Sequence, residues 1–147
     1  MQDLWSFQTP EMLVKDLKFI EKLSPEMCGI GPFVPHKDTK FKNENHGDVS
    51  LVLMLLSIIR LLKPNILLPA TTALGTVDPL GRENGILHGA NVVMPNLSPV
   101  KHRKDYSLYD NKICTGDEAA QCIGCLADRM KKIGCEIVTD RGDYTEE

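Results

Sequence analysis

The stretch NILLPATTALGT, residues 65–76, shows how this chain is built. It begins as a short apolar run, typical of a buried strand, and passes into a loop rich in Pro, Thr and Gly. The apolar run at 49–62 predicts a buried helix before it, and DPLGRENGILHGA predicts a short helix after it that ends near Gly89. A short buried strand with helices on both sides indicates a parallel sheet that is covered by helices.

The same alternation of helices and strands continues toward the amino terminus and toward residue 99. Thr9 is a suitable N-cap and Pro10 a suitable first helical residue, so a helix is predicted from there to about Leu23. MCGIG at 27–31 predicts a second buried strand, and NVVMPN at 91–96 predicts a third. No strand is predicted before the first helix.

Beyond residue 99 the alternation ends. The sequence there predicts a basic stretch, a loop with three cysteines, a helix over about 117–133 and a short end strand, CEIVTD, at 135–140. We therefore predict an α/β protein with two regions. Residues 1–99 form βα units, and residues 100–147 form a C-terminal extension with helical structure and a cysteine loop.

Length and composition predict one globular domain without nucleic-acid or membrane partners. The chain has 147 residues, of which 42% are hydrophobic and 25% charged, and its formal net charge is −3. The apolar run at 49–62 is shorter than the roughly 20 residues of a membrane helix, and it contains Arg60. The first residues lack the basic and apolar segments of a signal peptide, so a cytoplasmic, reducing location is expected.

The loop KICTGDEAAQCIGC at 112–125 contains Cys114, Cys122 and Cys125, the last two as a C-x-x-C pair. Three thiolates this close could bind a metal ion or an iron–sulfur cluster, with the fourth position taken by water, by Cys135 or by an exogenous ligand. The spacing does not choose between iron and zinc. The alternatives are unrelated thiols or a redox pair.

Polar or flexible residues follow each of the three predicted strands, at 32–36, 69–76 and 94–96. Because parallel βα proteins bind ligands at the carboxyl ends of their strands, these three loops are predicted to share one rim. The hydroxyls of Thr71 and Thr72 could bind an anion there, or they could cap the following turn. A histidine in the first loop, His36, is expected to be solvated.

Taken together, four stretches resemble one family. GIGPFVPHKDT (29–39), LLPATTALGT (67–76), GANVVMPNLSP (89–99) and YSLY…CIGC (106–125) resemble, in this order, the C-terminal half of HydE-type radical S-adenosylmethionine enzymes. These maturases help to assemble the di-iron site of [FeFe]-hydrogenase. GIGPF and PATTA alone also fit the related biotin synthase and methylornithine synthase. The cysteine spacing beside MPN and YSLY is what points to the hydrogenase maturases.

The resemblance implies a (β/α)8 TIM-type barrel, of which this chain supplies the C-terminal βα units. It also implies positions beside S-adenosylmethionine at Met27, Pro32, Val34, Met94 and Tyr106. From spacing alone, a methionine in such a strand is more often part of the core than a cofactor contact.

Two further sites come from the same resemblance. The substrate-binding positions, where the family binds small anions or carboxylates, are Thr71, Thr72 and Ala73. The ligands of an accessory iron–sulfur cluster, which is not the catalytic one, are Cys114, Cys122 and Cys125.

The sequence departs from the family in one respect that bears on catalysis. The C-x3-C-x2-C motif that holds the catalytic [4Fe–4S] cluster does not occur in this chain. We therefore expect no catalysis from the chain alone, and we expect it to need an N-terminal half or other maturation proteins as partners, with a small-molecule substrate. The alternatives are a non-enzymatic zinc or iron–sulfur module, or one half of a split biotin synthase-like radical S-adenosylmethionine enzyme.

Overall fold

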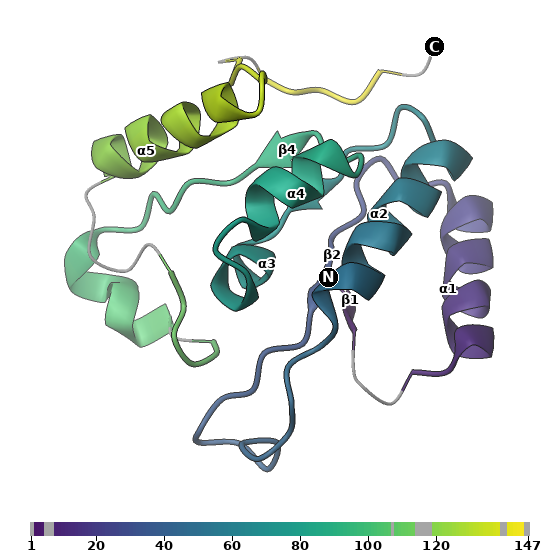
Figure 1. Ribbon diagram of the computed structural model, residues 1–147, viewed down its shortest axis with the longest axis horizontal. Coiled ribbons are helices and arrows are strands. Elements are labelled where there is room, and N and C mark those ends of the chain that lie inside the picture. The colour runs from purple at the N-terminus through teal and green to yellow at the C-terminus, as the bar shows by residue number, and fades with distance from the viewer. Residues whose placement is uncertain (1, 5–7, 107, 114–118, 139–140, 146–147) are drawn as a thin grey trace.

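The computed structural model describes residues 2–4, 8–106, 108–113, 119–138 and 141–145. Figure 1 shows short strands at the centre, α1 and α2 on one side of them and α5 on the opposite side. In chain order the elements are β1 (Gln2–Leu4), α1 (Pro10–Leu23), β2 (Ile30–Pro32), α2 (Val49–Leu62), β3 (Pro69–Ala70), α3 (Thr72–Val77), α4 (Gly81–Leu87), β4 (Val92–Val93), the 3-10 helix η1 (Val100–Tyr106) and α5 (Ala119–Lys132).

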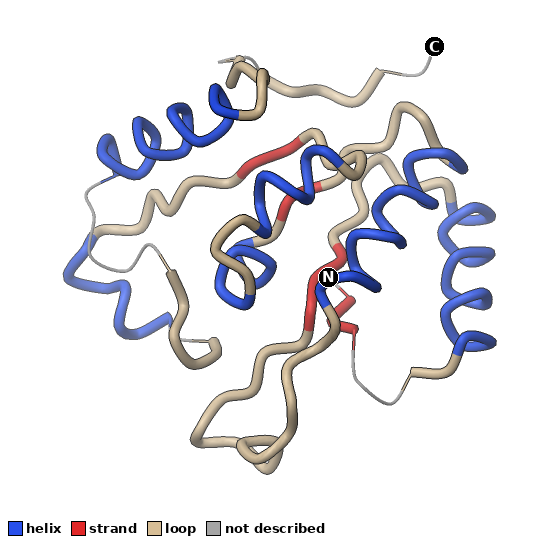
Figure 2. The backbone as a smooth tube through the Cα atoms, viewed as in Figure 1, coloured by secondary structure: helices blue, strands red, loops and turns tan. Residues whose placement is uncertain are grey.

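The strand segments pair in parallel and in chain order. Gln2 of β1 pairs with Ile30 of β2, and Pro69 of β3 pairs with Val92 of β4. A parallel bridge between Met27 and Leu67 joins the two pairs. The prediction of an α/β protein with parallel pairing is confirmed. Figure 2 shows these strands between the helices, and a long loop at 33–48 that extends away from them.

Two of the predicted helices, α1 and α2, begin where their local signals indicate. Thr9 caps α1, because its Oγ1 accepts a hydrogen bond from the amide of Met12 at 3.4 Å. Helix α1 ends at Ser24, which has a left-handed backbone with φ of 49°. Helix α2 spans the predicted apolar run, and its buried side chains include Val52 and Leu56.

Three predictions of secondary structure were wrong. Strand β1 precedes α1, although its three residues have no apolar pattern of their own, because its backbone pairs with β2. The Thr- and Gly-rich stretch after β3 is the helix α3 and not a loop, since Thr71 caps it. The predicted end strand is absent from the described residues 135–138, and Val138 there is 79% exposed.

The hydrophobic core lies between the strands and helices α1, α2 and α4. Leu56 and Ile59 of α2 pack in one cluster with Leu68 beside β3 and with Leu13 of α1, and all four are buried. This packing fixes the strands relative to the helices, so that the loops after β2 and β3 lie near each other. No helix in the described ranges is both long enough and apolar enough to cross a membrane.

Candidate functional site

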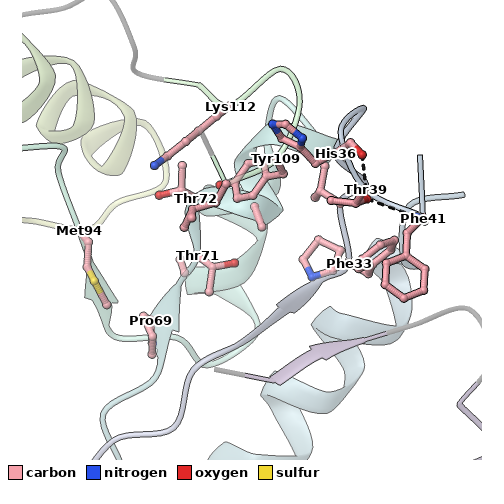
Figure 3. A pocket seen from close by; sticks show the side chains of 15 residues that line it. Phe33, His36, Thr39, Phe41, Pro69, Thr71, Thr72, Met94, Tyr109 and Lys112 are labelled. Carbon is pink, nitrogen blue, oxygen red and sulfur yellow. Dashed lines mark hydrogen bonds between the residues drawn. The ribbon is translucent and has the colours of Figure 1, made fainter. Parts of the chain in front are cut away.

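A cavity of about 330 Å³ lies at the carboxyl ends of β2, β3 and β4. Figure 3 shows Met94 and Thr72 on one side of it and Phe33 and Phe41 on the other. Its lining residues are Pro32, Phe33, Val34, His36, Thr39, Phe41, Pro69, Ala70, Thr71, Thr72, Ala73, Met94, Leu108, Tyr109 and Lys112. The loops that follow the three predicted strands therefore share one cavity.

The cavity brings together most of the predicted cofactor and substrate positions. The predicted residues among its lining are Pro32, Val34, Thr71, Thr72, Ala73 and Met94. Met27 does not line it. Met27 lies before β2, at the bridge to Leu67, and precedes Pro32 at the carboxyl end of β2 by five residues. Tyr106 is the last residue of η1, and its side chain lies outside the described part of the structure.

The two threonine hydroxyls of the cavity have different partners. Thr71 is buried, and its Oγ1 accepts a hydrogen bond from the amide of Leu74 at 3.3 Å. Thr71 therefore caps α3, which is one of the two alternatives given by the sequence. Thr72 Oγ1 accepts from Nη2 of Arg82 at 3.2 Å. Neither hydroxyl donates to any side chain or carbonyl that the structure describes. Because an oxygen that accepts a hydrogen bond can still give its own hydrogen, both are available as donors to a ligand.

Gly31 of β2 allows Thr71 to take this position. A Cβ atom added at Gly31 would lie only 2.7 Å from Thr71 Oγ1. The second glycine of the GIG motif is thus needed because β2 and the Thr71 side chain come this close. Sequence reasoning read this glycine only as the end of a strand.

A strap, residues 108–112, closes one side of the cavity with Leu108, Tyr109 and Lys112. Asp110 holds it, because its Oδ2 accepts from the amide of Lys37 at 2.8 Å and its own amide donates to the carbonyl of Pro35 at 3.2 Å. The strap has no periodic pattern and its partners lie 73 residues away. Sequence reasoning missed it for that reason.

The ionisable side chains of the described cavity lining are those of His36, Tyr109 and Lys112, and no carboxylate is among them. His36 was expected to be solvated, but only 18% of its side chain is exposed. Its Nδ1 accepts a hydrogen bond from the amide of Asp38 at 3.1 Å. The cavity thus combines apolar walls, two hydroxyl donors and a lysine, a set that suits a ligand with an apolar body and an anionic group.

Comparison with known proteins agrees with this arrangement. The chain is 44% identical over 135 residues to the [FeFe] hydrogenase maturase subunit HydE of Thermotoga maritima, and the match covers 92% of the chain. The chain is HydE-like. It spans 39% of the length of that relative. It is also 25% identical over 126 residues to the 3-methylornithine synthase of Methanosarcina acetivorans. That match covers 86% of the chain and 35% of the synthase. No family model matches the chain.

The predicted metal ligands of this HydE-like chain lie at and before α5. Cys114 lies outside the described residues, and the side chain of Cys122 is not described. Cys122 and Cys125 are three residues apart in α5, a spacing that puts them on one helix face. Cys125 is exposed. The described residues contain no group of three His, Cys, Asp or Glu side chains that could hold a metal ion.

A partly buried ion pair attaches α5 to α4 in this HydE-like chain. Arg129 donates from Nε and Nη2 to the two carboxylate oxygens of Glu83 in α4, both at 2.6 Å. The Glu83 side chain is only 8% exposed. The hydrogen bonds from Arg129 lower the pKa of the Glu83 carboxyl below its ordinary value, although burial opposes this. Leu126 and Met130 add buried apolar contacts on the same helix.

Proposed function

We propose that this chain forms one wall of the S-adenosylmethionine and substrate cavity of a radical S-adenosylmethionine enzyme that acts in [FeFe]-hydrogenase maturation. The observation that carries the proposal is the cavity itself, which unites Pro32, Val34, Thr71, Thr72 and Met94 in a chain similar to HydE. Those residues come from three segments, at the ends of β2, β3 and β4, that are far apart in sequence. A shared cavity at the carboxyl ends of parallel strands is the usual place for catalysis in such folds.

The barrel is part of the same proposal. The described strand segments of residues 1–99 follow one another in parallel and in chain order. We propose that they are βα units of a (β/α)8 barrel and that residues 100–147 extend from it. Eight strands typically need about 250 residues, so other segments would have to complete the cylinder.

The cavity suits S-adenosylmethionine as a ligand. Pro32, Val34 and Met94 offer an apolar wall for the uncharged part of the cofactor, and the hydroxyls of Thr71 and Thr72 beside it can donate to a carboxylate of the substrate. When bound, the cofactor supplies a sulfonium group whose reductive cleavage starts the family's chemistry. The residues of this chain bind and orient the ligand and exclude water from it. Tyr106 would border the cavity from η1.

The catalytic [4Fe–4S] cluster does not fit this chain. The described lining of the cavity contains no cysteine, and the chain has no C-x3-C-x2-C motif. We propose that a partner segment carries that motif. Cys114, Cys122 and Cys125 are proposed to hold the accessory iron–sulfur cluster, supported by the helical spacing of the last two.

Binding of S-adenosylhomocysteine to the full chain tests the cavity directly by calorimetry. Val34→Asp places a charge in the apolar wall and is expected to weaken binding by about tenfold or more, because a buried carboxylate without a partner is costly. Val14→Asp is the matched control, since Val14 is exposed on α1, and it should bind like the original chain. Equal loss in both variants, or no binding by the original chain, would contradict the proposal.

Activity is tested with and without the partner segment. After anaerobic reconstitution with iron and sulfide, the chain alone should release no 5′-deoxyadenosine from S-adenosylmethionine. The chain mixed with the N-terminal part of a HydE protein should release it. Release by the chain alone would show that the partner is not needed.

A further inference from the structure

Arg82, in α4, lies buried directly behind the cavity. It is 3% exposed, and its Nη2 donates to Thr72 Oγ1 at 3.2 Å. Its side chain passes close to Gly75 of α3, where an added Cβ atom would lie 3.2 Å from Arg82 Cγ and 3.4 Å from Nε. The glycine thus leaves the room through which the guanidinium reaches Thr72.

The charge of Arg82 is not neutralised by a direct carboxylate partner among the described residues. Both oxygens of the neighbouring Glu83 accept from Arg129, and no described ion pair includes Arg82. Nε of Arg82 has no hydrogen-bond partner within the described chain. A guanidinium does not lose its proton in proteins. The charge of Arg82 helps to lower the pKa of Glu83, but that carboxylate is already bound by Arg129, and a buried charge that is incompletely neutralised is costly. An anion bound nearby would offset this cost.

The hydrogen bond from Arg82 also decides what Thr72 can offer to a ligand. Because Thr72 Oγ1 accepts from a charged donor, its own hydrogen must point elsewhere, and the charge polarises the O–H bond. Thr72 lines the cavity, where it can donate. A ligand group that only accepts, such as a carboxylate, suits it better than one that also donates.

We propose that Arg82 is a positioning residue that turns Thr72 into a hydrogen-bond donor, so that the cavity binds a carboxylate in preference to the corresponding neutral amide. The inference rests on the proposed function only in taking this cavity as the ligand site. It does not depend on S-adenosylmethionine or on any cluster.

The test compares sodium acetate with acetamide as probes of the full chain. Each is titrated at constant ionic strength, and the NMR shifts of the backbone amides of residues 70–76 are followed. Acetate should bind at least about tenfold more tightly than acetamide. Arg82→Met should weaken acetate binding by about tenfold or more, which is the effect of losing one hydrogen bond to a charged group. The variant should leave the affinity for acetamide unchanged. Arg82→Lys keeps the charge and should restore part of the acetate affinity.

Two further variants separate positioning from a general structural role. Arg60→Met is the matched control, because Arg60 is another arginine that donates a hydrogen bond within the chain, from Nε to the carbonyl of Gly89 at 2.8 Å, but Gly89 does not line the cavity whereas Thr72 does. It should leave acetate affinity unchanged. In a Thr72→Val background, Arg82→Met should have no further effect on acetate, and Thr72→Ser should retain affinity within about twofold.

Each contrary result is decisive. Absence of acetate shifts at residues 70–76, or equal acetate affinity in a folded Arg82→Met variant, would overturn the inference. Should Arg82→Met fail to fold, Thr72→Val carries the test, since unchanged acetate affinity there overturns it equally. If acetate binding depends on Arg82 but the chain does not bind S-adenosylhomocysteine, this inference is supported and the proposed function is contradicted.

Discussion

At the scale of single residues, the cavity depends on close approaches that only a missing side chain permits. Gly31 lies against the hydroxyl of Thr71, and Gly75 lies against the side chain of Arg82. Gly31, on the neighbouring strand β2, thus makes room for the Thr71 hydroxyl, and Gly75, in the same helix as Thr72, makes room for the Arg82 side chain that donates to Thr72. Substitutions at these glycines should move a ligand-binding group and not only reduce stability.

Gly31→Ala tests this dependence. The added Cβ would lie 2.7 Å from Thr71 Oγ1, so the hydroxyl or the strand must shift, and we expect a loss of about 1–3 kcal/mol in the free energy of unfolding. The midpoint of urea unfolding measures it. Gly29→Ala, one residue before β2, is the matched control, since the nearest neighbour of its added Cβ, Cγ of Pro69, would be at 3.6 Å, an ordinary contact. A smaller loss for Gly31→Ala than for Gly29→Ala would be inconsistent with the close approach.

The residues of the site differ in how far sequence could predict them. The positions after each strand were predictable, because parallel βα folds bring the carboxyl ends of strands together. The partners Arg82 for Thr72 and Lys37 for Asp110 were not, since each pair joins elements whose approach is set by tertiary packing. His36 was missed because a loop histidine carries no local sign of burial.

At the scale of elements, α5 is held on α4 by a pair whose strength depends on pH. The pKa of Glu83 is lowered in the folded chain, chiefly by the hydrogen bonds from Arg129. Because the pKa of Glu83 is lower in the folded chain, the stabilisation is fully present above the ordinary pKa of a glutamic acid, about 4.3. It is lost as the pH falls from that value through the lower pKa of the folded chain. The attachment of α5 should therefore weaken in acid.

Glu83→Gln should remove this pH dependence. The variant is expected to unfold more easily than the original chain at pH 7, and the difference should shrink as pH falls from about 5 toward 3. Urea unfolding at several pH values measures both. Glu136→Gln is the control, because Glu136 is exposed beyond α5. A difference that stays constant over this range would mean that the ion pair is not what the carboxylate contributes.

The cysteines of α5 make a second prediction at this scale. After anaerobic reconstitution, the chain should be brown and contain iron and sulfide, and Cys125→Ser should lose most of both. Cys28→Ala should retain them, since burial raises the pKa of the Cys28 thiol and it lies beside β2, away from α5. A colourless protein with one zinc ion per chain would instead favour the structural metal module.

The elements themselves were predicted to different degrees. Helix α1 was predictable because it has a Thr9 cap, Pro10 at its start and an apolar period, and α2 because its sequence is one apolar run. Strand β1 was not, because three residues become a strand only through pairing with β2. The described residues 135–138 of the expected end strand show the reverse, since β-branched residues alone do not make a strand without a neighbouring strand.

At the scale of the whole molecule, the described chain leaves apolar surface and strand edges exposed. In α1, Met12, Phe19 and Leu23 are 51%, 63% and 59% exposed. Spacings of seven and four residues put these three on one face of the helix, next to the face that carries the buried Leu13 and Ile20. We refer to Met12, Phe19 and Leu23 as the α1 stripe. Strands β1 and β4 lie at the two borders of the described strand order.

These surfaces predict that the chain on its own self-associates, because a contiguous apolar stripe and unpaired strand edges both favour contact between copies. Light scattering after size-exclusion chromatography at increasing concentration should show a mass that rises above that of one chain.

Phe19→Lys combined with Leu23→Lys breaks the α1 stripe and should lower that mass. Val14 is 48% exposed and lies on the opposite face of the same helix. Val14→Lys therefore adds the same kind of charge without changing the α1 stripe, and it should not lower the mass. If the double variant associates as strongly as the original chain, the strand edges are the dominant contact. A concentration-independent monomer for the original chain would mean that neither surface drives association, and that these strands are stable without a covering partner.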